Sequence, residues 1–111
     1  MAISRDIAPH FIIGGMPRAG SSFLCTALDS HPEIQMAKPF VPEPKVFLGA
    51  ERPDHEYGES YRALFAPGAQ KPLRGEKSSA YFESEYCHRR IKAALPDVKM
   101  IFTFQIGRAH V

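Results

Sequence analysis

Residues 11–22 read FIIGGMPRAGSS, and this stretch decides the fold class. Its first three side chains form a short apolar run, as in a strand buried within a parallel sheet. Two glycines and a proline punctuate residues 15–20, which predicts a tight turn. Either hydroxyl of Ser21 and Ser22 can then cap a helix that runs to about Ser30. The order of strand, glycine turn and helix is typical of a phosphate-binding segment.

The rest of the chain continues the alternation of strands and helices. A second helix is predicted near residues 56–65, and a third begins after Ser84 and ends before Pro96. Three prolines make residues 38–45 an irregular loop. Further short strands are predicted at residues 34–36, 73–76 and 100–104. This order predicts an α/β protein, and we expect a P-loop-like three-layer fold with a parallel sheet, incomplete in this chain.

Apolar spacing predicts which helix faces are buried. The first helix would bury Phe23, Leu24, Ala27 and Leu28, and the third would bury Cys87, Ile91, Ala94 and Leu95. The two cysteines, Cys25 and Cys87, make neither a disulfide framework nor a metal motif. We expect both to be buried thiols.

Composition bounds the function. The chain has 111 residues, 44% hydrophobic and 23% charged, which is typical of a globular domain. Its net charge of +2 is too small to indicate a nucleic acid or an anionic membrane as partner. The apolar runs are too short for a signal peptide or a membrane segment, so we expect a cytoplasmic protein.

The glycine turn predicts an anion site. Backbone N–H groups at a helix N-terminus point into one concavity, and the helix dipole adds positive charge there. Ser21, Ser22 and Arg18 can supply further donors. The Gly15–Gly20 spacing resembles a Walker A loop, but Ser21 stands where that motif has its lysine. This argues against a nucleoside triphosphate and for a single phosphate. A tight turn that binds nothing is the alternative.

Three segments resemble the PAPS-dependent sulfotransferases, which use 3′-phosphoadenosine 5′-phosphosulfate (PAPS). Residues 17–24, PRAGSSFL, resemble the loop that binds the 5′-phosphosulfate. Residues 43–48, EPKVFL, resemble the loop with the catalytic glutamate, and residues 75–82, GEKSSAYF, resemble the E-K-[ST]-x-x-Y-F segment of heparan-type enzymes. The sequence HPE at residues 31–33 is also typical of the carbohydrate and tyrosyl-protein branches. The resemblance covers residues 11–104.

This resemblance implies the roles of individual residues. PAPS would be the sulfuryl donor, no metal would be needed, and the acceptor would be a hydroxyl or amine of a small molecule, glycan or lipid. Glu43 would be the general base, while Lys77 and Lys45 would line the transfer site. The residues expected to hold the 5′-phosphosulfate are Arg18, Ala19, Gly20, Ser21 and Ser22.

The chemistry agrees with these residue types. Sulfuryl transfer resembles phosphoryl transfer, so catalysis is mostly positioning and electrostatic stabilisation. A carboxylate can take the acceptor's proton, and cations can stabilise the charge on the sulfuryl oxygens and leaving phosphate. His31 and Glu76 are the next candidates for the base after Glu43. A P-loop nucleotide kinase or NTPase, and a non-catalytic nucleotide-binding homologue or inactive fragment, are the competing functions.

The end of the chain departs from the family's pattern. After residues 100–104 the family has an arginine- and serine-containing motif for the 3′-phosphate, but residues 105–111 read QIGRAHV. The codons ATC GGA AGA GCA CAC GTC encode residues 106–111 and lie within a common sequencing-library adapter. We therefore expect residues 1–104 to be the N-terminal part of a sulfotransferase domain, inactive alone, and residues 105–111 to be a non-native tail. A genuine divergent terminus is the alternative.

Overall fold

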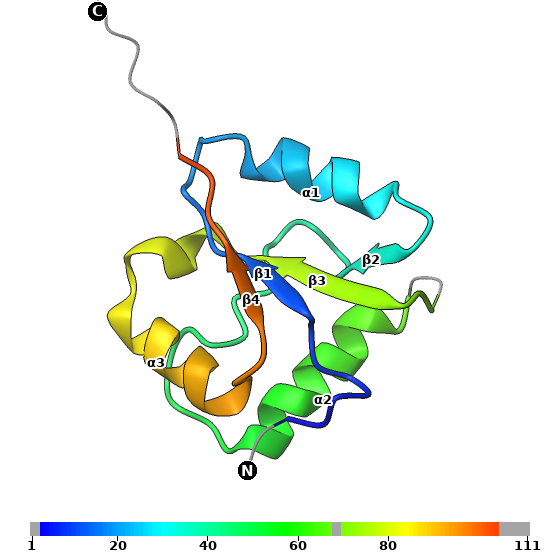
Figure 1. The fold of residues 1–111 in the computed structure, drawn as a ribbon. Helices are drawn as coiled ribbons and strands as arrows, with labels where there is room; N and C mark the ends of the chain where they lie inside the picture. Colours follow the sequence, from blue (N-terminus) through cyan, green and yellow to red (C-terminus); the bar gives the residue numbers. More distant parts are fainter. Residues whose placement is uncertain (1–2, 68–69, 105–111) are drawn as a thin grey trace, which may run out of the picture.

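The computed structural model describes residues 3–67 and 70–104, where four parallel strands form one sheet in the order β2-β3-β1-β4. Figure 1 shows β1 between β3 and β4. Each parallel neighbour is reached by a crossover connection, because parallel strands cannot be joined by a tight hairpin. The strands are β1 (Phe11–Ile13), β2 (Ile34–Met36), β3 (Leu73–Lys77) and β4 (Lys99–Ile101).

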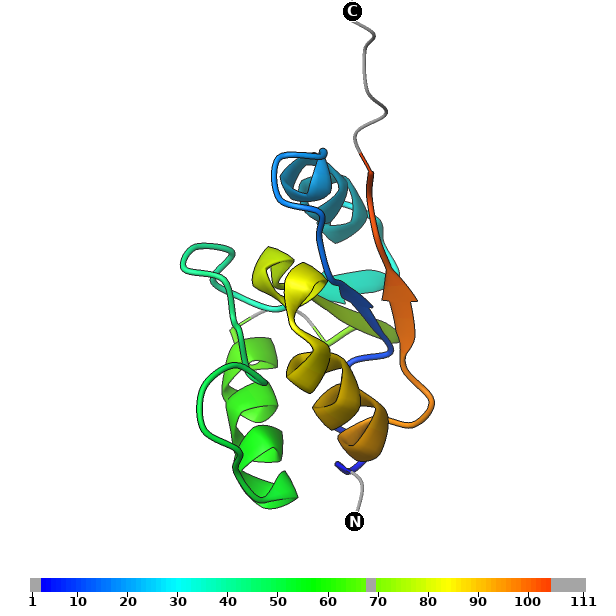
Figure 2. The same ribbon diagram turned by 90° about the vertical axis from the view of Figure 1, so that its left-hand side faces the viewer.

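Helices cover both faces of this sheet. Figures 1 and 2 show α1 on one side, with α2 and α3 together on the other. The helices are α1 (Ser21–Asp29), α2 (Asp54–Phe65) and α3 (Glu85–Ala94), and a short 3-10 helix, η1 (Ser79–Glu83), lies between β3 and α3. The predicted α/β class with a parallel sheet is therefore confirmed. The predicted tail at residues 105–111 lies outside the described residues.

The pleat of β1 divides the core into two clusters. Phe11 and Ile13 pack with Cys25 of α1, whereas Ile12 packs with side chains from α2 and α3 on the opposite face. Successive side chains of a strand point to opposite faces, so this short strand serves both layers. Gly75 of β3 lies against the ring of Phe11, where a β-carbon would overlap the ring atoms.

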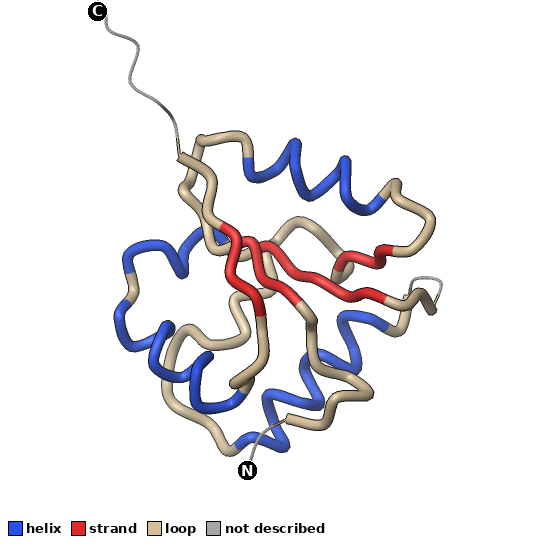
Figure 3. Tube along the Cα trace, viewed as in Figure 1, coloured by secondary structure: helices blue, strands red, loops and turns tan. Residues whose placement is uncertain are grey.

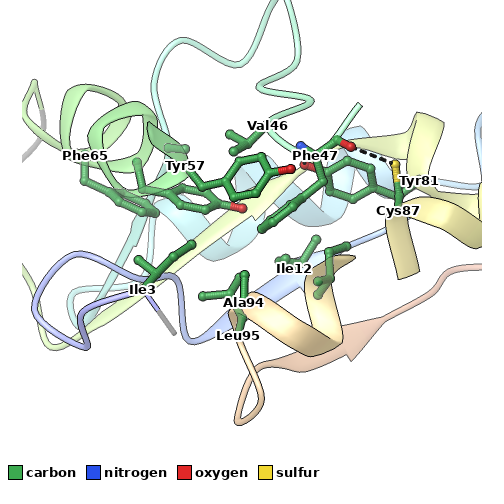
Figure 4. Packing of buried hydrophobic residues seen from close by; sticks show 13 residues of the cluster. Ile3, Ile12, Val46, Phe47, Tyr57, Phe65, Tyr81, Cys87, Ala94 and Leu95 are labelled. Carbon is green, nitrogen blue, oxygen red and sulfur yellow. Dashed lines mark hydrogen bonds between the residues drawn. The ribbon is translucent and has the colours of Figure 1, made fainter. Parts of the chain in front are cut away.

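The larger cluster is aromatic and includes a loop residue, Phe47. Its ring centroid lies 4.6 Å from that of Tyr57 and 6.2 Å from that of Tyr81. In Figure 4 the Phe47 ring lies among these side chains, and its carbonyl oxygen accepts a hydrogen bond from Cys87 Sγ at 3.4 Å. Phe47 is fully buried and thereby fixes one end of the proline-rich loop.

Most predicted elements are confirmed, within a residue or two at their ends. Ser84 caps α3 by accepting a hydrogen bond from Cys87 N at 3.3 Å. The predicted irregular loop is also present, since residues 37–53 contain neither helix nor strand (Figure 3). Both cysteines are buried, with 2% exposure for Cys25 and none for Cys87.

Two predictions about α1 are wrong. The N-cap is Gly20, in a left-handed conformation with φ 84°, and no side chain in residues 3–67 and 70–104 caps the helix. Phe23 is 79% exposed and Ala27 is also exposed. The face that packs on the sheet is formed by Ser21, Cys25 and the partly buried leucines. Ser21 and Cys25 stand four residues apart, so this stripe fits the same helical period as the predicted one.

The last strand differs from its prediction as well. It ends at Ile101 rather than at Phe104, and Phe104 is 63% exposed. In the described sheet β4 pairs with β1 alone, so its side chains are only partly covered. No helix in the described part of the chain is long and apolar enough to cross a membrane.

Candidate functional site

The candidate site lies at the carboxyl ends of β1 and β3. Ile13 and Lys77 are the last residues of these adjacent strands, and they are partners in the parallel register. The glycine turn and α1 follow Ile13, whereas Ser78 and η1 follow Lys77. Ligands of open α/β sheets bind at this edge, because loops from neighbouring strands converge there.

The glycine turn leaves the start of α1 open to an anion. Gly20 and Arg18 both have positive φ, 84° and 63°. The first N–H groups of any α-helix have no acceptor within the helix, and no side chain among the described residues caps them here. The Arg18 side chain is exposed and makes no hydrogen bond or ion pair within residues 3–67 and 70–104. It is therefore available to a ligand.

Lys77 connects the turn to the glutamate loop. Its Nζ lies 2.7 Å from Glu43 Oε2 and donates a hydrogen bond to Ser22 Oγ at 3.1 Å. The side chain of Lys77 is 9% exposed and that of Glu43 is 16% exposed. Three segments distant in sequence thus meet at one ammonium group, and little water reaches it.

Glu43 is held by a second partner as well. Its Oε1 accepts hydrogen bonds from Ser79 N at 2.9 Å and from Ser79 Oγ at 3.0 Å. Burial raises the pKa of the Glu43 carboxyl, but the hydrogen bonds from Lys77 and Ser79, together with the Lys77 charge, outweigh burial and lower the pKa below its usual value. Glu43 is therefore ionised at neutral pH and acts as an acceptor.

The other predicted residues lie around this contact in different ways. Ser22 is bonded to Lys77. Ser21, the first residue of α1, is buried, and Ala19 is partly buried in the turn. The Lys45 side chain is exposed, and no hydrogen bond or ion pair within the described residues joins it to Lys77 or Glu43. Lys45 is attached to this region by its backbone, whose N–H donates to Ser78 Oγ at 2.8 Å. Its φ is 49°.

The two alternative bases lie elsewhere. His31 is exposed beyond the far end of α1, where its Nδ1 accepts a hydrogen bond from Glu33 N. Glu76 is fully buried on the face covered by α2, where the Tyr61 hydroxyl donates to it. Neither carries its titratable group at the Lys77 contact, so Glu43 is the carboxylate placed there.

Sequence reasoning missed the second partner of Glu43 and the environment of Glu76. Ser79 lies within the segment at residues 75–82, but no role of its own was predicted for it. A hydroxyl and a backbone N–H just after a strand are nevertheless suited to bind a carboxylate. Burial raises the pKa of Glu76 to about 7, although the hydrogen bonds from Ser78, Tyr61 and Tyr81 lower it. A charged residue at a strand end is exposed by default, so the sequence carried no sign of this burial.

The donors at this site suit an anion, because they are backbone N–H groups, a hydroxyl and two cationic side chains. No group of three or more His, Cys, Asp or Glu side chains is arranged to hold a metal within residues 3–67 and 70–104.

The sequence matches no protein-family model and no curated protein. The chemistry of the site is therefore inferred from its own geometry and from the motifs that meet there.

Proposed function

We propose that this chain carries the donor-binding turn and the catalytic base of a sulfotransferase, which moves a sulfuryl group from PAPS to a hydroxyl or amine. The observation that supports the proposal most is the position of Lys77, between Glu43 and Ser22. The three segments that resemble this family come from separate parts of the chain, yet the Lys77 ammonium of one segment contacts a residue in each of the other two. The turn would bind the donor in the manner of a P-loop. The acceptor would be a small molecule, a glycan or a lipid, and the protein would act in the cytoplasm.

The residues present fit the anionic end of such a donor. The N–H groups at the start of α1, the Ser22 hydroxyl and the Arg18 guanidinium are all donors, and Lys77 adds a second positive charge. Helix N-termini bind phosphate and sulfate through this combination of N–H groups and dipole. With Ser21 in place of the Walker lysine, the turn lacks the group that would serve a triphosphate.

Glu43 would take the acceptor's proton, and Lys77 would control when it can. In the free chain the pKa of Glu43 is lowered, because the Lys77 and Ser79 hydrogen bonds outweigh the effect of burial, and this makes Glu43 a weak base. Lys77 can exchange Glu43 for an anion at the start of α1, since Ser22 already lies within its reach. Loss of the Lys77 hydrogen bond then raises the pKa of Glu43 and strengthens the base.

Bound at the turn, PAPS supplies an activated sulfuryl group on a phosphate leaving group. Arg18 and Lys77 stabilise the charge that develops there, and the low exposure of Lys77 strengthens that interaction. The Ser79 hydroxyl and N–H keep the Glu43 carboxylate in place while the proton moves to it. Positioning and charge stabilisation would together account for the catalysis.

Calorimetric titration of the full chain tests the proposal. Adenosine 3′,5′-bisphosphate carries the 5′-phosphate that the turn would hold, so we expect it to bind and to compete with PAPS. Magnesium-ATP is the comparison ligand, and preferential binding of magnesium-ATP would favour the P-loop kinase instead. Absence of binding by either nucleotide would contradict a nucleotide site at this turn.

A further inference from the structure

The fully buried Glu76 is connected through hydroxyl groups to the loop that carries Glu43. We propose that Glu76 is a positioning residue for Glu43, acting through Ser78 and Tyr81 to hold residues 43–47 beside Lys77. The role assigned to Glu43 rests on the proposed function, whereas the mechanical link to the loop does not depend on it.

The first connection runs through Ser78. Its Oγ donates to Glu76 Oε1 at 2.6 Å and accepts the Lys45 N–H at 2.8 Å. A serine hydroxyl has one proton, and Glu76 Oε1 accepts it, so Glu76 directs that proton toward itself. The lone pairs of Ser78 are thereby left to receive the Lys45 N–H. The residue bonded in this way stands two positions after Glu43.

The second connection runs through Tyr81. Its hydroxyl donates to Glu76 Oε2 at 3.4 Å and accepts the Phe47 N–H at 3.2 Å. Figure 4 shows this hydroxyl directed at the backbone of Phe47. A third hydroxyl, that of Tyr61 on α2, also donates to Glu76 but makes no bond to the loop within the described residues. Tyr61 therefore provides a matched control.

Burial makes these bonds hard to replace. Glu76, Ser78, Tyr81 and Tyr61 are all fully buried. Phe47 is fully buried as well, so its N–H would find no water to replace a lost partner. Lys45 also has φ 49°, a conformation that a residue with a β-carbon keeps only when its surroundings impose it. The bond from its own N–H to Ser78 and the anchored Phe47 N–H supply that restraint.

Amide hydrogen exchange of the full chain, followed by NMR, tests the link without any nucleotide. In Glu76→Gln we expect the Lys45 and Phe47 amides to exchange at least tenfold faster, while the Ile12 and Ile91 amides change much less. Ser78→Ala should release the Lys45 amide alone, and Tyr81→Phe the Phe47 amide alone. Tyr61→Phe should release neither.

The pKa of Glu43, measured by ¹³C NMR, gives a second readout with an informative sign. Removal of the Glu76 charge by itself would lower the pKa of Glu43, because one nearby negative charge is lost. Loosening of the loop would weaken the Lys77 and Ser79 hydrogen bonds and raise it. We expect a rise in Glu76→Gln and no rise in Tyr61→Phe.

Unchanged protection of both loop amides, or an equal loss of protection at every amide, would overturn the proposal. If Glu76→Gln does not fold, Ser78→Ala and Tyr81→Phe decide through their separate amides. None of these measurements involves the donor. A chain that binds no nucleotide but shows the selective exchange would refute the proposed function and keep the link. A chain that binds the nucleotide without the selective exchange would support the proposed function and refute the link.

Discussion

Lys77 Nζ and Glu43 Oε2 lie 2.7 Å apart, joining the last residue of β3 to the middle of a proline-rich loop. Both side chains are largely buried, so the contact works at a lower effective dielectric than a surface ion pair. Breaking a largely buried pair by removing one partner is costly, because it leaves a charge without compensation. An incoming anion would give Lys77 a new partner, and Glu43 would then keep only its hydrogen bonds from Ser79. The lost Lys77 contact would appear as a raised pKa of Glu43.

This exchange predicts a shift in the pKa of Glu43 when a nucleotide binds. Saturation with adenosine 3′,5′-bisphosphate should raise the pKa of Glu43, because Lys77 turns toward the phosphate and an added negative charge lies nearby. In Lys77→Met we expect a Glu43 pKa that is already raised and responds less to the nucleotide. ¹³C NMR titration measures both. A Glu43 pKa that stays low in the nucleotide-bound wild type would rule out the exchange.

Arg18→Ala should weaken binding of adenosine 3′,5′-bisphosphate. A charged hydrogen bond contributes about 1.5–3 kcal/mol, which corresponds to a loss of roughly 10- to 100-fold in affinity. Calorimetry measures the change, and Arg62→Ala on α2 is the matched control, since this exposed arginine lies on a helix that covers the opposite face of the sheet. Equal affinities for the wild type and Arg18→Ala would place the anion elsewhere.

The pH dependence of stability should change in Glu76→Gln. The pKa of Glu76 is raised by burial to about 7, from an ordinary value of 4.5. The folded state therefore binds the proton more tightly than the unfolded state does. The resulting stabilisation is complete below pH 4.5 and is lost as the pH rises through 7. It amounts to roughly 3 kcal/mol over that interval.

Urea unfolding at a series of pH values measures this term as the difference between the wild type and Glu76→Gln. The difference should fall between pH 4.5 and 7 and be flat on either side. Glu59→Gln, at an exposed position of α2, should show no such slope. A wild-type curve parallel to that of Glu76→Gln throughout would mean that Glu76 titrates at its ordinary pKa in the folded chain.

Gly75→Ala should destabilise the sheet. A β-carbon at Gly75 would overlap the ring of Phe11, and overpacking of this kind costs about 1–3 kcal/mol. The double variant Phe11→Leu/Gly75→Ala should recover part of the loss. Gly58→Ala is the control, because its β-carbon would meet side-chain methyl groups of Ile7 at 3.2 Å and Ile3 at 3.7 Å, and alanine favours the helix. Thermal unfolding that ranks the two alanine variants equally would contradict this packing.

The sequence predicted elements better than it predicted their faces. α3 was identifiable because Ser84 and the spacing of Cys87 and Ile91 are local signals that agree with the tertiary packing. On α1 the same period admitted two stripes, and the sheet is covered by the one containing Ser21 and Cys25. Which stripe is buried depends on the room left between helix and sheet, and no local pattern records it.

The site was predictable as a set of motifs but not as a geometry. Lys77 and Glu76 are adjacent in the sequence, yet the strand directs one toward the turn and the other into the tyrosine cluster. Alternation along β3 predicts that they diverge, but only the parallel register with β1 shows which of them faces α1. The Ser79 bond to Glu43 also required the path of the loop, which its prolines leave irregular.

One cysteine lies in each helical layer, so the rate of thiol modification at each position reports on the opening of that layer. Burial raises the pKa of the Cys25 thiol to about 11, so a thiolate-selective reagent can modify Cys25 only after α1 lifts from the sheet. Cys87 reports on α3 through access alone, because its side chain is fully buried in the opposite layer. Alkylation of the two thiols at different rates in the native protein would show that one helical layer detaches while the other remains closed.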